Sequence, residues 1–326
     1  MARLKVLDSL VWSQCPTPVD IEEAVERGVA LVVNLDPSCS GYYKRAEELG
    51  VEVVEHPIQP LSFRPVEEVN SLVYRILGVV SVGRRVMVHA GNGDGRCGTF
   101  LMMTLTALGV PDPSEVVGSV GGPESLVQEH AVAWYARLLD LLGVEKLYSL
   151  YEIGRQYEFG AGLEHASTVA NLSLDFAEAL KPRVEFDERL LASVYVAGLL
   201  HDVGRFFSER RHEEIGVRIV MGSARVLEEV ADLNLVVFGV RHHRRHTKPS
   251  KDPLLNVVGD EGLHLAAIVR LADAFTNVYG KEEYWGVHLE DESLVVRARF
   301  VNKRRFEEKG KLLREVVGVT PTLEHA

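Results

Sequence analysis

The sequence has few cysteines and no long hydrophobic run, and both shortages narrow the class of protein. Only Cys15, Cys39 and Cys97 occur in 326 residues. An odd and sparse set of cysteines fits a reducing compartment better than a disulfide framework, so we expect a cytoplasmic protein. No apolar run resembles a signal peptide, and none reaches the roughly 18 residues that a bilayer span requires, which predicts no membrane association.

Positive charge is also scarce. Lysine and arginine number 36 against 47 aspartates and glutamates, which gives a formal net charge of -11 and a pI near 5.6. A general nucleic-acid binder would carry a basic surface, so this balance argues against that class and leaves room for a basic pocket that binds a small phosphorylated substrate.

Glutamine and asparagine are scarce beside valine, arginine and glutamate, a bias reported for thermophilic proteins.

The apolar patterns divide the chain into two domains, as its length also suggests. Up to residue 143, strand patterns alternate with amphipathic helices, which predicts an α/β domain with a central, mostly parallel sheet flanked by helices. Long helical patterns follow, and residues 287–300 alternate around a polar turn as in a β-hairpin. We therefore predict an α/β domain over 1–147 and a mostly α-helical domain over 148–326 that ends in a small hairpin and a helix.

The elements expected in the first domain follow from these patterns. The predicted strands cover 29–36, 51–58 and 84–90, and the predicted helices cover 66–80, 96–109 and 128–143.

A glycine-rich segment joins the last of these strands to a helix. Converging backbone N–H groups, the helix N-terminus and the guanidinium of Arg96 could together bind phosphate. A glycine-rich turn that binds nothing is the alternative. The candidate phosphate-binding residues are Gly91, Asn92, Gly93, Asp94, Gly95 and Arg96.

Residues 5 to 145 resemble the dual-specificity, cysteine-dependent protein phosphatases, whose signature is His-Cys, five residues, Arg, then Ser or Thr and Gly. The resemblance implies an α/β phosphatase fold with a phosphate-binding P-loop. Here His89 is followed by Ala90 in place of the nucleophile, and a methyl group cannot attack phosphorus. Cys97 stands where the family has Ser or Thr, beyond the arginine, so we do not expect it to replace the nucleophile.

The general acid of that family is also missing from its usual place. Residues 56–65 contain no aspartate or glutamate, although Asp94 could serve as an alternative acid. A nucleophile changed in the laboratory would leave the acid in place. Of the two origins of Ala90, natural loss and engineering, the sequence therefore favours natural loss.

The second half carries histidines and aspartates on several predicted helices. Side chains of this kind from separate helices can converge on one metal. His201 and Asp202 directly follow the apolar segment 194–200, so we expect both to be buried. Burying an ionisable pair without a partner would cost roughly several kcal/mol, and a bound metal would remove that cost. The candidate ligands are His165, His201, Asp202, His212, His242, His243 and Asp273.

This half resembles the HD phosphohydrolases, whose ligand pattern is His, then His-Asp, then a distant Asp, and within them the HD domain attached to the exopolyphosphatase and guanosine pentaphosphate phosphohydrolase family. The resemblance implies one or two divalent ions of Mn, Fe, Mg, Ni or Zn. Asp202 would bridge the two ions and take part in catalysis, and Arg205 would neutralise charge on the substrate. His165, His201, Asp202 and Asp273 would hold the first ion, and Asp202, His212 and either His242 or His243 the second.

Three functions are compatible with these patterns. The first is a metal-dependent phosphohydrolase that acts on a phosphoester or phosphoanhydride, such as a nucleotide or polyphosphate, with a phosphate-binding but inactive N-terminal domain. The second is a cysteine-type phosphatase that has lost its nucleophile at Ala90 and carries an accessory HD domain. The third is a non-catalytic sensor of phosphorylated ligands, since the HD domain of the exopolyphosphatase family is itself an appendage.

Overall fold

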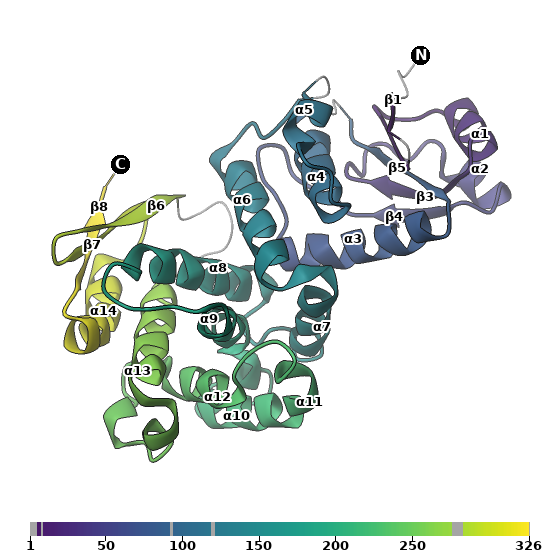
Figure 1. Ribbon diagram of the computed structural model, residues 1–326. Coiled ribbons are helices and arrows are strands. Elements are labelled where there is room, and N and C mark those ends of the chain that lie inside the picture. Colours follow the sequence, from purple (N-terminus) through teal and green to yellow (C-terminus); the bar gives the residue numbers. More distant parts are fainter. Residues whose placement is uncertain (1–4, 8, 92–93, 119–120, 276–282, 326) are drawn as a thin grey trace. The chain divides into compact units, whose positions relative to one another are not determined.

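A computed structural model describes residues 5–7, 9–91, 94–118, 121–275 and 283–325 (Figure 1). The chain forms two compact units, Met1–Glu145 and Lys146–Ala326, so the division falls close to the predicted boundary at 147. The first is an α/β unit and the second a mostly helical unit with a small sheet, which confirms both predicted fold classes. The predicted loop residues Asn92 and Gly93 lie outside the described residues.

The first unit is built on a five-stranded sheet with the order β1-β2-β5-β3-β4. The strands β2, β5, β3 and β4 are parallel, and β1 is antiparallel to β2. The central strands are runs of valine, leucine and methionine because helices cover parallel sheets on both faces. The strands are β1 (Lys5–Leu7), β2 (Leu10–Ser13), β3 (Val29–Asn34), β4 (Glu52–Glu55) and β5 (Arg85–His89).

The helices of this unit confirm the three that the sequence predicted and add others. Thr17 and Asp20 form a capping box that begins α1, whereas α4 follows β5 directly through the glycine-rich segment. The first two strands and α1 were not predicted because each is short and carries little periodicity. The helices are α1 (Pro18–Glu26), α2 (Tyr43–Glu48), α3 (Val66–Ser81), α4 (Asp94–Ala107), α5 (Pro113–Val117) and α6 (Leu126–Leu141).

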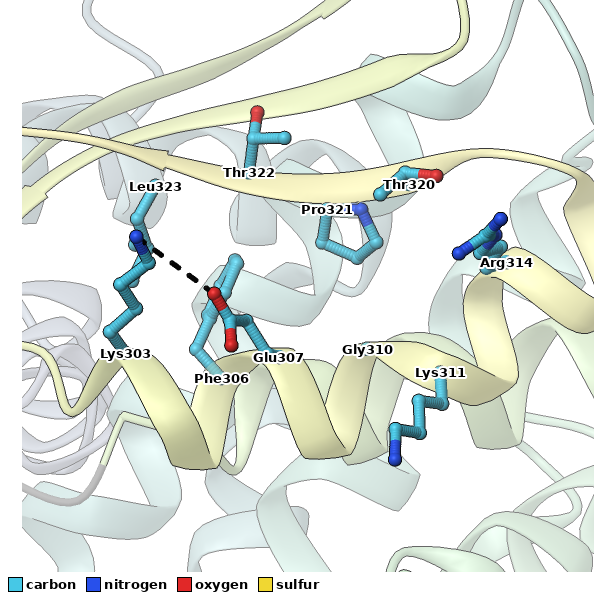
Figure 2. A pocket seen from close by; sticks show the side chains of 10 residues that line it. All are labelled: Lys303, Phe306, Glu307, Gly310, Lys311, Arg314, Thr320, Pro321, Thr322 and Leu323. Carbon is cyan, nitrogen blue, oxygen red and sulfur yellow. Dashed lines mark ion pairs between the residues drawn. The ribbon is translucent and has the colours of Figure 1, made fainter.

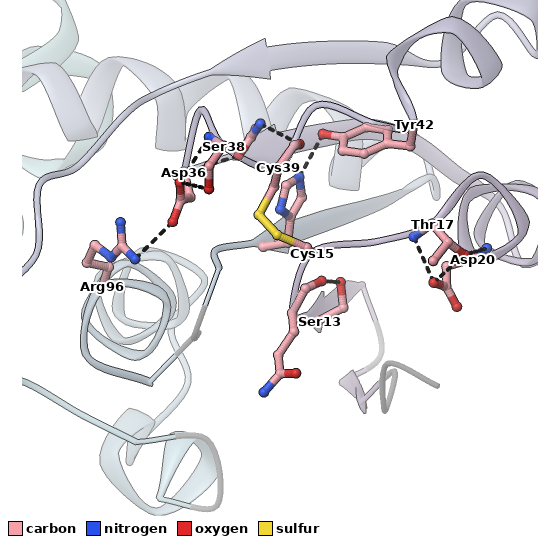
Figure 3. The surroundings of a disulfide bond; sticks show 12 residues. Ser13, Cys15, Thr17, Asp20, Asp36, Ser38, Cys39, Tyr42 and Arg96 are labelled. Atoms are coloured by element: carbon pink, nitrogen blue, oxygen red, sulfur yellow. Dashed lines mark hydrogen bonds and ion pairs between the residues drawn. A yellow bond between two sulfur atoms is a disulfide. The ribbon is translucent and has the colours of Figure 1, made fainter.

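A disulfide joins Cys15 to Cys39, with the two Cα atoms 5.2 Å apart (Figure 3). The expectation that the cysteines do not form disulfides was therefore wrong. Cys15 follows β2 and Cys39 follows β3, and both strands run parallel to β5. The carboxyl ends of parallel strands meet at one edge of a sheet, which brings together cysteines 24 residues apart. Cys97 is buried in α4 and takes no part in this bond.

The second unit is centred on α8 and α9, which are buried almost all round and pack against each other. Aspartates cap two of its helices: Asp187 accepts a hydrogen bond from the Leu190 N–H at the start of α9, and Asp232 accepts one from the Leu235 N–H at the start of α12. The helices are α7 (Gly143–Arg155), α8 (Leu163–Leu180), α9 (Glu188–Leu200), η1 (Val203–Phe206), α10 (His212–Gly222), α11 (Ala224–Leu227), α12 (Leu233–His242), η2 (Pro249–Lys251), α13 (Leu255–Ala272) and α14 (Lys303–Val317).

The chain ends in a three-stranded sheet. The antiparallel pair β6 (Glu283–Glu290) and β7 (Ser293–Arg299) confirms the predicted hairpin. The sequence did not predict β8 (Thr320–Glu324), which pairs parallel to β7 after α14. One face of α14 lies along β8 and lines a cavity of about 560 Å³ with it (Figure 2). Gly310 permits this approach, because a Cβ there would lie 2.7 Å from the ring of Pro321.

No helix in the described part of the chain is both long and apolar enough to cross a bilayer.

Candidate functional site

Histidine and aspartate side chains from five helical segments converge in the second unit. Most stand at helix ends, where the backbone turns and the side chain can point across the bundle. His165 lies in α8, His201 and Asp202 directly follow α9, His212 begins α10, His243 follows α12, and Asp273 follows α13.

The carboxylate of Asp202 lies between two pairs of histidines. Its Oδ1 is 3.2 Å from Nε2 of His212 and 3.4 Å from Nε2 of His243. Its Oδ2 is 3.5 Å from Nε2 of His201 and 3.8 Å from Nε2 of His165. All five residues are buried, and each oxygen with its two imidazoles forms a group that could hold a metal ion.

Backbone carbonyls fix the orientation of three of these imidazoles. The Nδ1 atoms of His201, His212 and His243 lie 2.7, 2.9 and 2.8 Å from the carbonyl oxygens of the residues three positions earlier. A carbonyl can only accept, so each Nδ1 carries a proton, and each Nε2 faces the cluster, where it presents a lone pair when the imidazole is neutral. Metal-binding histidines characteristically have their other ring nitrogen anchored in this way.

The lone pairs inside the cluster need a positive partner. The Nε2 atoms of His212 and His243 are 3.0 Å apart, and two lone pairs at that distance repel unless a proton or a cation lies between them. Nε2 of His201 is buried and has no hydrogen-bond partner among the described residues. The donor set of imidazole nitrogens and carboxylate oxygens suits a divalent transition metal, so of the predicted ions the residues present fit Mn, Fe, Ni and Zn better than Mg, which prefers oxygen ligands.

Both aspartates of the cluster are held in their charged form. Burial alone would raise the pKa of Asp202, but the neighbouring His201 and His243 lower it well below its usual value on balance. Asp273 behaves similarly: burial opposes ionisation, and the hydrogen bond with His165 and the charge of Lys309 outweigh it, so its pKa is also low. Two ionised carboxylates in a buried site are the ligands that a divalent cation requires.

Two glycines let the backbone close around Asp202. Gly160 has a φ of +74°, and a Cβ there would collide with the backbone carbonyl of Asp202. A Cβ at Gly204 would likewise collide with the carbonyl of His212. Glycine at both positions therefore permits the close approach of the segments that carry Asp202 and His212.

A cavity of about 470 Å³ opens onto the cluster. Arg205 lies at this cavity, and it donates hydrogen bonds to Oδ2 of Asp202 at 3.0 Å and to the carboxylate of Glu209. Every described side chain of the lining is charged or an imidazole. The lining residues are Asp202, Arg205, Glu209, His212, His243, Arg244, Arg245, His246, Asp273, Arg305, Glu308 and Lys309.

The structure does not bring His242 to the cluster. Its Nε2 is 2.9 Å from Oδ2 of Asp252, and its ring packs against Phe238. The pKa of His242 is lowered, chiefly by burial. Of the two histidines that the sequence offered for the second ion, His243 is the one whose Nε2 faces Asp202.

Sequence reasoning missed two cations of α14. Nη2 of Arg305 lies 3.1 Å from Oδ1 of Asp273, and Nζ of Lys309 contacts Oδ2 of the same carboxylate. Their spacing of four residues places both side chains on one face of the helix. That spacing was the available signal, but nothing in the sequence indicated that this face would reach Asp273.

The predicted phosphate loop of the first unit is flanked by carboxylates. Arg96 donates to the carbonyl oxygen of Ile58 at 2.9 Å. It also donates to Oδ2 of Asp36 at 3.1 Å (Figure 3). Hydrogen bonds from Ser38 lower the pKa of Asp36, and Arg96 lowers it further. A Cβ at Gly91 would lie 2.6 Å from Oδ2 of Asp36. A phosphate at this loop would therefore have to displace Asp36 from Arg96.

The residues at the ends of the loop offer no exposed nucleophile. Ala90 and Cys97 are both buried, and a Cβ at Gly95 would collide with the carboxylate of Glu124. The structure describes the side chains of neither the predicted residues 92–93 nor Asp94. The sequence missed Asp36 and Glu124 because both lie outside the loop motif.

Comparisons with known proteins agree with the division into two units. Residues 162–278 match the HD domain family, so this part of the second unit is an HD domain. No curated protein matches the chain.

The N-terminal region is similar to solved phosphatase structures. Tk-PTP in its active form is 25% identical, with 41% of this chain and 96% of that chain covered and a TM-score of 0.37. Human DUSP28 is 18% identical, with 42% and 94% covered and a TM-score of 0.37. TpbA of P. aeruginosa is 18% identical, with 46% and 90% covered and a TM-score of 0.33.

Proposed function

We propose that the second unit catalyses the metal-dependent hydrolysis of a phosphoester or phosphoanhydride. The observation that carries this proposal is the carboxylate of Asp202, whose two oxygens face two different pairs of histidines. A carboxylate in this position could contribute one oxygen to each of two ligand sets for divalent cations. Such cations, when bound, would supply Lewis-acid activation of water and neutralise charge on the phosphoryl group.

The residues divide into two ligand sets around Asp202. His165, His201 and Asp273 would complete the first set, since Oδ1 of Asp273 lies 3.5 Å from Nε2 of His165 and 3.9 Å from Nε2 of His201. His212 and His243 would complete the second. Arg205 keeps Asp202 in place through its hydrogen bond and can turn its charge to the substrate phosphate.

The cavity supports a small, phosphate-dense substrate. Five of its lining side chains are lysine or arginine, and none of the described lining side chains is aliphatic. A nucleobase normally packs against apolar or aromatic surface, and the aromatic side chains of the described lining are the imidazoles of His212, His243 and His246, the first two of which face Asp202. Of the two substrates considered from the sequence, these contacts favour a polyphosphate-like compound over a nucleotide held by its base.

We propose a non-catalytic role for the first unit. Ala90 carries no nucleophilic atom. Cys97 is buried in α4 and follows Arg96, whereas the nucleophile position precedes it. Arg96 and the backbone of the loop could still bind phosphate or sulfate, but the ion pair with Asp36 would compete. This competition predicts weak anion binding.

Two substitutions distinguish metal catalysis from thiol catalysis. Asp202→Ala removes the carboxylate that both ligand sets share. Hydrolysis of a panel of phosphorylated compounds with Mn²⁺ should therefore fall by at least about 10- to 100-fold, which is the loss typical when only a residue that supports a metal ligand is replaced. Cys97→Ser should leave turnover within a few-fold, and EDTA should abolish it in the unmodified chain. Metal analysis of each purified variant completes the comparison.

The opposite pattern would move the chemistry to the first unit. If Cys97→Ser lost activity while Asp202→Ala kept it, the proposal would be wrong. Bound metal without turnover on a broad panel would instead favour the sensor of phosphorylated ligands.

A further inference from the structure

The carboxylate of Asp273 is shared between the histidine cluster and α14. Its Oδ1 faces Nε2 of His165 at 3.5 Å and accepts from Nη2 of Arg305 at 3.1 Å. Its Oδ2 contacts Nζ of Lys309. A candidate metal ligand is therefore neutralised by two side chains that cannot bind a metal themselves, since ammonium and guanidinium groups are donors only.

Lys309 and Arg305 differ in exposure, but both line the same cavity. Lys309 is buried at 9% exposure, which is unusual for lysine and requires a partner of opposite charge. The Arg305 side chain is 38% exposed, yet its Nε is buried and has no hydrogen-bond partner among the described residues. Arg305 lines the cavity, so its guanidinium has donor capacity that the described residues do not fully use.

We propose that Arg305 and Lys309 of α14 are phosphate-binding residues of the second unit, held in place by Asp273 until that carboxylate ligates a metal. The inference rests on the proposed function, because it requires that Asp273 serve as a ligand. A divalent cation held at Oδ1 would draw on the single negative charge of Asp273, so the carboxylate would neutralise the ammonium at Oδ2 less completely. That ammonium would then lie buried beside another positive charge, which is unfavourable unless an anion enters.

A phosphate oxygen in the cavity would meet this need. It would accept from Nζ of Lys309 and from the guanidinium of Arg305, and its negative charge would offset the charge that Asp273 shares with the metal. Metal binding and phosphate binding are then coupled, and each should tighten the other by the same factor. The predicted signs for a loss of Lys309 are therefore opposite: tighter binding of metal and weaker binding of phosphate.

Calorimetry on the full chain tests these signs with Lys309→Met. Titration with Mn²⁺ alone should show affinity raised several-fold, because the metal no longer competes with the ammonium for Asp273. Titration of the Mn²⁺-loaded protein with inorganic phosphate and with pyrophosphate should show affinity lowered by about 10- to 100-fold, which corresponds to a lost hydrogen bond from a charged group. Lys303→Met is the matched control, because Lys303 is 70% exposed on the same helix and pairs with Glu307 (Figure 2).

Further variants separate binding from folding. Arg305→Met changes a half-exposed residue and should shift both affinities in the same directions by smaller factors, whereas Lys309→Arg should retain phosphate binding. A decrease in Mn²⁺ affinity in Lys309→Met, or unchanged phosphate affinity in both Lys309→Met and Arg305→Met, would overturn the inference and leave the metal site intact. Absence of Mn²⁺ binding to the unmodified chain would refute the proposed function instead.

Discussion

The buried histidines of the two units differ in what their ring nitrogens face. In the HD domain the Nε2 atoms of His201, His212 and His243 converge on a carboxylate. In the first unit His56 packs beside Phe100, and its Nε2 is buried without a partner among the described residues. A group of histidines around a carboxylate can hold a cation, whereas an isolated buried histidine mainly opposes its own protonation.

Burial lowers the pKa of His56 to about 4, and this shift predicts acid sensitivity. The unfolded chain binds a proton at this residue below about pH 6.5, but the folded chain does so only below about pH 4. The stability that neutral His56 contributes is therefore complete above about pH 6.5 and lost as the pH falls through about 4. The loss is at most about 3 kcal/mol.

His56→Leu should reduce this dependence. Urea unfolding of the full chain at pH 7 and near pH 4 would measure it, with the exposed His325 changed to leucine as the control. We expect the difference in unfolding free energy between the two pH values to shrink in His56→Leu and to stay unchanged in the control. An equal pH dependence in the unmodified chain, His56→Leu and the His325 control would show that His56 takes up its proton as readily in the folded chain as in the unfolded chain.

At the scale of elements, the end of α12 separates two adjacent histidines. Successive residues of a helix point about 100° apart, so His242 and His243 cannot face the same centre. His242 meets Asp252, which also accepts from Arg241 at 2.7 Å, while His243 faces Asp202. Helix geometry thus assigns different roles to two residues that the sequence could not separate.

Glutamine substitutions at these two positions test the assignment. His243→Gln removes an imidazole from the second ligand set and should lower the bound metal from about two ions to about one per chain. His242→Gln should keep the metal content and instead lower stability by about 1 to 3 kcal/mol, since a buried partner of Asp252 is lost. Metal analysis by mass spectrometry and thermal unfolding would give both numbers. Equal metal loss in both variants would refute the separation.

Elements with a strong local pattern were predictable from the sequence. The valine-rich β3 and β5 and the amphipathic α3 carry their periodicity in their own residues, so the prediction needed no partner. β8 was missed because it pairs with β7 only after α14 has returned the chain. A five-residue strand carries too little pattern of its own to be identified.

Part of the candidate site was also predictable from the sequence, because some of its residues belong to a local motif. The His201 and Asp202 pair follows an apolar run and forms a recognisable motif with His165 and Asp273, all four of which the structure places near one another. Lys309 and Asp36 belong to no motif. Their roles depend on tertiary packing, which brings α14 to Asp273 and places the segment after β3 beside the glycine-rich loop.

At the scale of the whole molecule, the chain separates its two kinds of candidate site by unit. The glycine-rich loop and the disulfide between Cys15 and Cys39 lie within Met1–Glu145. All the proposed metal ligands and all the described residues that line their cavity lie within Lys146–Ala326. Hydrolysis as proposed therefore needs no side chain of the first unit.

A fragment that starts at residue 143 should retain the proposed chemistry. This cut keeps α7 whole, because the helix begins at Gly143, and it keeps the complete ligand set. We expect the fragment to bind Mn²⁺ with the affinity of the full chain and to hydrolyse the same substrate with kcat/KM within a few-fold, while residues 1–142 alone should show no turnover. Reduction of the disulfide in the full chain should lower the stability of the first unit, by about 3 kcal/mol for a loop of this length, without changing hydrolysis. A fragment that binds Mn²⁺ normally but turns over at least about 100-fold more slowly, a loss of about 2.7 kcal/mol, would mean that the first unit contributes directly to the reaction.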